Sequence, residues 1–190
     1  YTLEDKRKVN RILKYLHGTI DMGINFIKKD ELNIELYADA SHGIHEDGKG
    51  HSGLCIMINN SPILVKSSKQ KIVSLSSTES ELICLSDSII YLIGLKNFIN
   101  NLGFNVNNMK VYQDNLSTIQ LIEHNNPRSQ RTKHINIRYF SIKEKLNENN
   151  LQLSHKRSSE MIADILTKPL QGNIFKILSK RLLNYEMNCS

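Results

Sequence analysis

The stretch from Ser76 to Leu95, SSTESELICLSDSIIYLIGL, restricts the possible folds most, because it predicts a long helix with one apolar side and an acidic residue close to that side. Apolar side chains recur at spacings of three and four, the period of a helix with one buried face. These side chains are Leu82, Leu85, Ile89 and Leu92. At about 100° per residue, Glu81 lies roughly 60° from the centre of this face and Glu79 roughly 100° from it. We therefore expect Glu81 to lean toward the surface that the helix covers.

Glu81 also has a purely local interpretation. Thr78 and Glu81 have the S/T-x-x-E spacing of a capping box, in which a hydroxyl and a carboxylate each satisfy a free backbone N–H group at a helix start. Under this interpretation the Glu81 carboxylate only stabilises the end of the helix. The other acidic residues of the chain bear on the choice.

The segments on either side of this helix carry strand and helix patterns in turn. From Glu31 onward, apolar and polar residues alternate with a period of two, which predicts a strand that Asp39 closes. Further strands are expected at 54–58, from 63 onward, at 109–113 and at 151–155, and further helices at 4–17, 116–123, 131–146, 160–166 and 174–183. An antiparallel three-strand meander followed by α/β crossovers predicts an α/β fold: a five-stranded mixed sheet, with parallel strands after the meander, flanked by helices.

Length and composition limit the class of protein. The 190 residues suffice for one α/β domain with an appendage, and we expect a tether helix in residues 1–30, the domain in 31–170 and a C-terminal helical extension in 171–190. There is no run of eighteen apolar residues and the start is charged, so we expect neither a membrane partner nor secretion. Three scattered cysteines indicate neither a disulfide framework nor zinc. The net charge of +6 favours an acidic partner such as nucleic acid.

Four carboxylates stand where an α/β sheet collects functional groups, at strand ends and helix starts. Asp39 and Asp114 end the first and fourth strands, Glu81 begins the long helix, and Asp164 lies on a late helix beside Lys168. If those two strands are neighbours, their aspartates meet. Clustered carboxylates need cations, and two Mg²⁺ ions about 4 Å apart suit both oxygen ligands and an in-line displacement at phosphorus. Singly, each aspartate is an ordinary turn residue or solvated helix charge, but their joint order favours a phosphodiesterase.

Five motifs carry a family resemblance. They are YADASHG, SLSSTESELICLS, VYQDNLSTIQLI, RTKHINIRYFSIKEKL and MIADILTKPL. In this order and at these distances they resemble the ribonuclease H domain at the C-terminal end of copia-type LTR retrotransposon Pol polyproteins. The resemblance runs from about Leu32 to Leu170. In addition, NRILKYLHGTIDMGINF resembles the segment that joins the reverse transcriptase to that domain.

The resemblance implies a ribonuclease H-like fold and an endonuclease that hydrolyses the RNA strand of an RNA–DNA hybrid during reverse transcription. It implies that Asp39, Glu81, Asp114 and Asp164 are the catalytic metal ligands for two Mg²⁺ ions, with Mn²⁺ as a possible substitute. The partners that it implies are the hybrid and the reverse transcriptase domain of the same polyprotein. The expected location is a retrotransposon particle in the cytoplasm, or the nucleus.

The resemblance also suggests nucleic-acid contacts. In the wider superfamily the stretch before the glutamate contacts a phosphate, and helix N-terminal N–H groups suit that role. The expected contact residues are Ser41, Ser76, Ser77, Asn115, Arg131 and Lys133. The positions of Arg131 and Lys133 are equally explained by the solvated, charged start of a helix. Cellular ribonucleases H have a mobile histidine before the last carboxylate, whereas here that connection is short, and His155 is expected on or just after a strand.

Two other function classes remain open. One is a catalytically silent ribonuclease H-fold module that binds nucleic acid inside a larger assembly. The other is a transposase or integrase nuclease, which normally has its glutamate on a helix after both aspartates. Here Glu81 stands between Asp39 and Asp114, which counts against that class.

Overall fold

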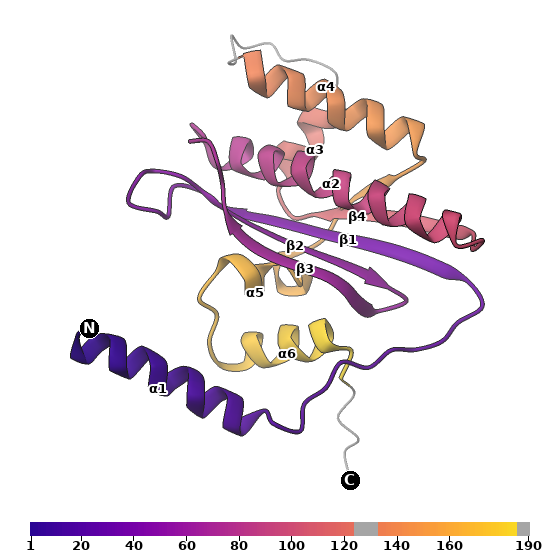
Figure 1. The fold of residues 1–190 in the computed structure, drawn as a ribbon. Coiled ribbons are helices and arrows are strands. Elements are labelled where there is room, and N and C mark those ends of the chain that lie inside the picture. The colour runs from indigo at the N-terminus through magenta and orange to yellow at the C-terminus, as the bar shows by residue number, and fades with distance from the viewer. Residues whose placement is uncertain (124–132, 186–190) are drawn as a thin grey trace.

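The computed structural model describes residues 1–123 and 133–185, and side chains except those of residues 133–135 (Figure 1). Its elements are α1 (Leu3–Gly18), β1 (Leu32–Ser41), β2 (His51–Ile58), β3 (Ser61–Lys69), α2 (Ser77–Asn101), β4 (Val106–Gln113), α3 (Leu116–Glu123), α4 (Lys133–Glu148), β5 (Gln152–His155), the 3-10 turn η1 (Ser158–Glu160), α5 (Asp164–Thr167) and α6 (Gly172–Leu183). The predicted order of strands and helices is confirmed.

The five strands form one mixed sheet in the order β3-β2-β1-β4-β5. β1 pairs antiparallel with β2, and β2 pairs antiparallel with β3, which is the predicted meander. β1 pairs parallel with β4, and β4 pairs parallel with β5. The first and fourth strands are therefore neighbours, as the predicted meeting of Asp39 and Asp114 requires. Asp39 does not close its strand, however, because β1 continues to Ser41 in its pairing with β2.

Helices cover the two faces of the sheet unequally (Figure 1). α2, with α3 and α4 beside it, lies on one face, whereas α5 and α6 lie on the other. The first face carries most of the core, including Ile34, Leu36, Ala38, Leu54, Ile56, Leu82, Leu85, Ile89, Leu92, Val111 and Ile142. A smaller cluster lies on the second face: Tyr37, Cys55, Met57, Met161, Ile162 and Ala163.

α2 is the central helix of the larger core. Ser76 is its N-cap, and the Ser76 hydroxyl accepts a hydrogen bond of 3.2 Å from the backbone N–H of Glu79. Glu79, and not Glu81, reaches back to the helix start by accepting from the backbone N–H of Leu75 at 2.8 Å. The Thr78–Glu81 capping box is therefore wrong, and Glu81 is free for another role. By length and composition alone α2 is also apolar enough to cross a membrane, but half of that window is buried inside the protein, as in a core helix.

The start of β3 and the late helix differ from the sequence prediction for local reasons. Asn59 and Asn60 both have positive φ, which makes a two-residue hairpin turn, so β3 begins at Ser61 and not at Ile63. Pro62 fits within β3 because β3 is an edge strand. The single late helix expected at 160–166 is instead the turn η1 followed by the four-residue helix α5.

The N-terminal segment lies apart from the main core. α1 has no buried residues, and its apolar side chains Ile12, Leu13 and Leu16 are more than half exposed. Tyr15 packs edge-on against Phe175 of α6, with ring centroids 6.1 Å apart. The division into tether, domain and extension stays a prediction.

Candidate active site

Three of the four predicted carboxylates meet beside the C-terminal ends of the neighbouring strands β1 and β4, which we call the acidic edge of the sheet. Asp39 lies in β1 and Asp114 follows β4, and these strands run parallel with Tyr37 opposite Tyr112, so both aspartates leave the sheet side by side. Asp164 begins α5, which brings the third carboxylate to the other two. Carboxylate oxygens of the three aspartates lie within 4.8 Å of one another. Asp39 and Asp164 are buried, and Asp114 is partly exposed.

A glycine allows α5 to come this close. Gly53 of β2 lies directly opposite Asp39 in the antiparallel register. A Cβ atom at Gly53 would lie 2.8 Å from the Cβ of Leu166 and 2.8 Å from the Cγ2 of Thr167, closer than real contacts allow. The missing side chain lets α5 sit on the sheet, where the Thr167 hydroxyl donates a hydrogen bond to Asp39 Oδ2. The Ser41 hydroxyl donates to the Thr167 carbonyl at 3.1 Å and fixes the same contact from the end of β1.

Glu81 lies beside this triad, just after the first turn of α2, and is only 5% exposed. Gln113, the last residue of β4, donates from Nε2 to Glu81 Oε2 at 3.2 Å. The Gln113 Oε1 atom accepts from the backbone N–H groups of Asp114 at 2.8 Å and Asn115 at 3.1 Å. Burial raises the pKa of Glu81 well above its ordinary value, and the negative charges of Asp39 and Asp114 add to that effect. Sequence periodicity thus placed Glu81 correctly on the inner side of the helix.

A lysine forms ion pairs with two aspartates of the triad. Lys168 Nζ lies 2.8 Å from Asp164 Oδ1 and 3.3 Å from Asp39 Oδ1. Burial raises the pKa of Asp164 to about 6, with a further rise from the charge of Asp39 and an opposing effect from the Lys168 hydrogen bond. For Lys168 itself burial lowers the pKa, but the bond to Asp164 and the charge of Asp39 outweigh burial, so its pKa is raised. The third aspartate, Asp114, accepts from the Ser158 hydroxyl at 2.8 Å.

The predicted nucleic-acid contacts have mixed positions. Ser76 caps α2 and Ser77 is its first residue, both exposed. Asn115 caps α3, because its Oδ1 atom accepts from the backbone N–H of Thr118 at 3.0 Å. Arg131 lies outside the described residues, and Lys133 begins α4 with a side chain that is not described. Roles in nucleic-acid binding therefore stay predictions, as does any role for His155, which ends β5 and is exposed.

Four supporting residues were not predicted: Gly53, Gln113, Thr167 and Ser158. Gln113 sits at the end of the β4 pattern and Thr167 on the last turn before Pro169, but neither position distinguishes a site residue from an ordinary polar one. Lys168 was placed beside Asp164 without a role. The spacing of four between them was the available signal, since oppositely charged residues at that spacing pair along a helix.

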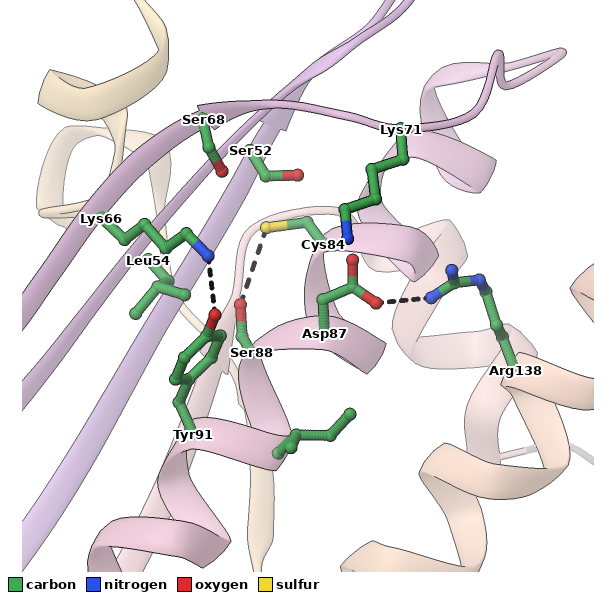
Figure 2. Close-up of a pocket in the computed structure, with 11 residues that line it drawn as sticks. Ser52, Leu54, Lys66, Ser68, Lys71, Cys84, Asp87, Ser88, Tyr91 and Arg138 are labelled. Carbon is green, nitrogen blue, oxygen red and sulfur yellow. Dashed lines mark hydrogen bonds and ion pairs between the residues drawn. The ribbon is translucent and has the colours of Figure 1, made fainter.

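A cavity of about 320 Å³ lies behind the acidic edge, between β2, β3 and α2 (Figure 2). In Figure 2, Lys66 points to the Tyr91 hydroxyl, at 2.6 Å, and Asp87 to Arg138, also at 2.6 Å. Cys84 is shared with the site, because its thiol donates to the Asp39 carbonyl at 3.1 Å. Burial raises the pKa of Cys84 to about 12, so this thiol stays protonated. Cys84, which lines the cavity, thus contacts the backbone of Asp39, but none of the three clustered aspartates lines the cavity.

Comparison with known proteins agrees with this geometry. The chain is 34% identical over 181 residues to the retrovirus-related Pol polyprotein from transposon TNT 1-94 of Nicotiana tabacum, and 31% identical over 176 residues to that from transposon RE2 of Arabidopsis thaliana. These alignments cover 95% and 92% of the chain. The chain is a homologue of copia-type retrotransposon Pol polyproteins. It spans only 13% and 12% of the lengths of these two relatives. No family model matches the chain.

Solved structures confirm the fold of this Pol segment. The N-terminal ribonuclease H domain of a Mycobacterium tuberculosis protein, fused to maltose-binding protein, aligns with a TM-score of 0.53 and 8% identity, over 79% of this chain and 98% of that one. LC11 ribonuclease H1, in complex with an RNA/DNA hybrid, aligns with a TM-score of 0.54 and 14% identity, over 70% of this chain and 92% of that one. The Pol segment has the ribonuclease H fold.

Proposed function

We propose that this Pol segment is a divalent-metal-dependent nuclease that hydrolyses the RNA strand of RNA–DNA hybrids, leaving a 3′-hydroxyl and a 5′-phosphate. The observation that carries the proposal is the convergence of Asp39, Asp114 and Asp164, with Glu81 beside them, at one sheet edge of a ribonuclease H fold. The solved LC11 enzyme, whose fold this chain shares, is held in complex with such a hybrid.

The residues at this edge fit Mg²⁺. The donors are carboxylate oxygens, which hard divalent cations prefer, and they come from β1, α5 and the residue after β4. Burial and the neighbouring aspartates raise the pKa values of Glu81 and Asp164, which disfavours their charged forms, and a bound divalent cation would offset that effect. We propose that Asp39, Glu81, Asp114 and Asp164 hold two Mg²⁺ ions, for which Mn²⁺ can substitute. When bound, such ions activate water and stabilise the charge that develops on the leaving oxygen.

The protein's own groups orient the carboxylates. Thr167 fixes one oxygen of Asp39, and Ser158 fixes one oxygen of Asp114. Gln113 connects the Glu81 carboxylate to the backbone that follows β4, so the helix and the strand keep one relative position. A carboxylate held in this way loses little freedom when it takes up a cation, which favours a preorganised site.

The neighbouring helix starts suit the nucleic-acid backbone. The exposed N-terminus of α2 at Ser76 and Ser77 presents backbone N–H groups and the positive end of the helix dipole. Asn115 precedes α3 and follows Asp114 directly in the chain, so it lies beside the acidic cluster. We propose that Ser41, Ser76, Ser77, Asn115, Arg131 and Lys133 contact the hybrid. The net charge of +6 would make this binding dependent on salt.

The relatives are much longer than this chain. Because the chain corresponds to a small part of its Pol relatives, we propose the reverse transcriptase domain of the same polyprotein as its partner and a retrotransposon particle as its location. Residues 1–30, which contain the exposed helix α1, would connect the two domains.

The test is cleavage of a fluorescent RNA–DNA hybrid in Mg²⁺ by the chain, by Asp114→Asn and by the matched control Asp21→Asn. Asp21 is an exposed acidic residue before β1. We expect Asp114→Asn to lower the rate by about a thousandfold and Asp21→Asn to leave it unchanged, since loss of one metal-ligating carboxylate removes transition-state charge stabilisation. Equal rates for all three proteins contradict the proposal. Tight hybrid binding without turnover by the unmodified chain would instead support the silent binding module.

A further inference from the structure

Lys168 occupies an unusual position for a surface lysine. Its ammonium group lies between two aspartates of the triad, 2.8 Å from Asp164 and 3.3 Å from Asp39, while about a third of its side chain remains exposed. The Asp39 and Asp164 carboxylates are 1% and 8% exposed at the same contacts. The positive charge thus reaches inward to two buried carboxylates, whereas the stem keeps access to water.

The backbone around Lys168 holds this arrangement. The Lys168 N–H group donates to the Asp164 carbonyl at 2.9 Å, which closes α5. Pro169 follows and favours the extended conformation that Lys168 adopts, with φ −122° and ψ 140°. The preceding Thr167 is fixed against Asp39. The Lys168 side chain is therefore the movable part of a segment whose backbone is anchored on both sides.

One ammonium and one divalent cation compete for the same oxygens. The Asp39 and Asp164 oxygens that contact Lys168 belong to carboxylates that the triad offers as metal ligands. A cation between these carboxylates and the ammonium within 3.3 Å of them would repel each other strongly at such short range. Metal binding therefore requires the Lys168 ammonium to withdraw along its exposed stem.

We propose that Lys168 is a built-in counterion of the acid triad, which keeps the carboxylates together before metal binds and sets the affinity for the divalent cation by competing with it. This inference rests on the proposed function, because it assigns a metal to the same carboxylates. Lys168 is a positioning residue under this proposal. The withdrawn ammonium stays close to the acidic cluster, where it can pair with a phosphate of a bound nucleic acid.

The test measures Mn²⁺ binding by isothermal titration calorimetry without nucleic acid, for the unmodified chain, Lys168→Met and Lys168→Arg. Methionine keeps an unbranched stem and removes the charge, whereas arginine keeps the charge. The matched control is Lys176→Met, which removes one charge from an exposed position on α6. We expect Lys168→Met to bind Mn²⁺ on the order of tenfold more tightly, because the competing buried ion pair is gone. Lys168→Arg and Lys176→Met should stay within about twofold of the unmodified chain.

A second readout needs no metal. In EDTA, Lys168→Met should unfold at a lower temperature than Lys176→Met, since three close carboxylates then lack their counterion, and saturating Mn²⁺ should raise its Tm more than that of the unmodified chain. Unchanged or weaker Mn²⁺ affinity in Lys168→Met overturns the proposal. If the unmodified chain and Lys168→Met both bind no Mn²⁺, the proposed metal site fails as well. If the unmodified chain binds Mn²⁺ and cleaves the hybrid but Lys168→Met gains no affinity, only the counterion role fails.

Discussion

The two faces of the sheet differ in the size of their apolar cores and in the residues that they contribute to the candidate site. We call the face covered by α2 and α4 the thick face and the face covered by α5 and α6 the thin face. α2 and α4 cover one face with the larger apolar core, whereas α5, only four residues long, and α6 lie on the other, where the buried cluster is smaller. Yet the thin face supplies Asp164, Thr167 and Lys168 to the acidic edge. The larger core therefore supplies most of the stability. Apart from Glu81 on α2, it does not hold the acidic cluster, so core mutations away from Glu81 should separate folding from activity.

The largest expected effect is on the thick face. Leu85→Ala removes a fully buried side chain from the core beneath α2 and should lower the free energy of unfolding by about 2–5 kcal/mol. Urea denaturation followed by circular dichroism measures this loss. Below its unfolding temperature the variant should cleave the hybrid at the unmodified rate per folded molecule. A large fall in that rate would contradict the division of roles between the faces.

A smaller energetic effect, with a larger functional one, is expected on the thin face. Gly53→Ala places a methyl group 2.8 Å from Leu166 and Thr167, which pushes α5 off the sheet. The cost in stability should be about 1–3 kcal/mol. Displacement of Asp164 and Lys168 should lower hybrid cleavage by about a hundredfold. Both are measured in the same denaturation and cleavage assays.

The control for that substitution is Gly94→Ala on α2. A Cβ atom at Gly94 meets no heavy atom within 4 Å, and alanine favours the helix, so this variant should be as stable as the unmodified chain or more stable. Full activity in Gly53→Ala would show that α5 does not need its close contact with β2.

The smallest effect is the pH dependence of the thin face. Because the pKa of Asp164 is raised from 3.8 to about 6 in the folded state, its contribution to stability is present below about pH 4 and is lost as the pH rises through 6. In EDTA, the Tm of Asp164→Asn minus that of the unmodified chain should therefore increase by a few degrees between pH 4 and pH 7. Thermal denaturation at several pH values measures it. A difference that stays constant with pH would contradict the raised pKa.

The sequence predicted the parts of this molecule that depend on local periodicity. The period-two alternation predicted β1, and the three-and-four spacing placed Glu81 on the inner side of α2. The positions of Asp39 and Asp114 near the ends of their strands predicted that the two side chains meet. The five motifs, in their order and at their distances, made the family resemblance correct before any coordinates.

Such local patterns could not predict contacts between segments that are far apart in the sequence. Thr167 and Asp39 are 128 residues apart, and their bond depends on the register of β1 with β2 and on the close approach that Gly53 permits. Likewise, the late helix was predicted as one piece over 160–166, whereas the structure divides this segment into η1 and α5. A pattern along one segment carries no information on what that segment meets.

The position of α5 in the chain has a consequence for synthesis. Asp39, Glu81 and Asp114 belong to elements translated early, but Asp164 and Lys168 arrive only with the last short helix before α6. A growing polypeptide on the ribosome therefore lacks part of the acidic cluster until residue 168 has left the exit tunnel. The candidate site is thus assembled late, after most of the sheet that supports it has been made.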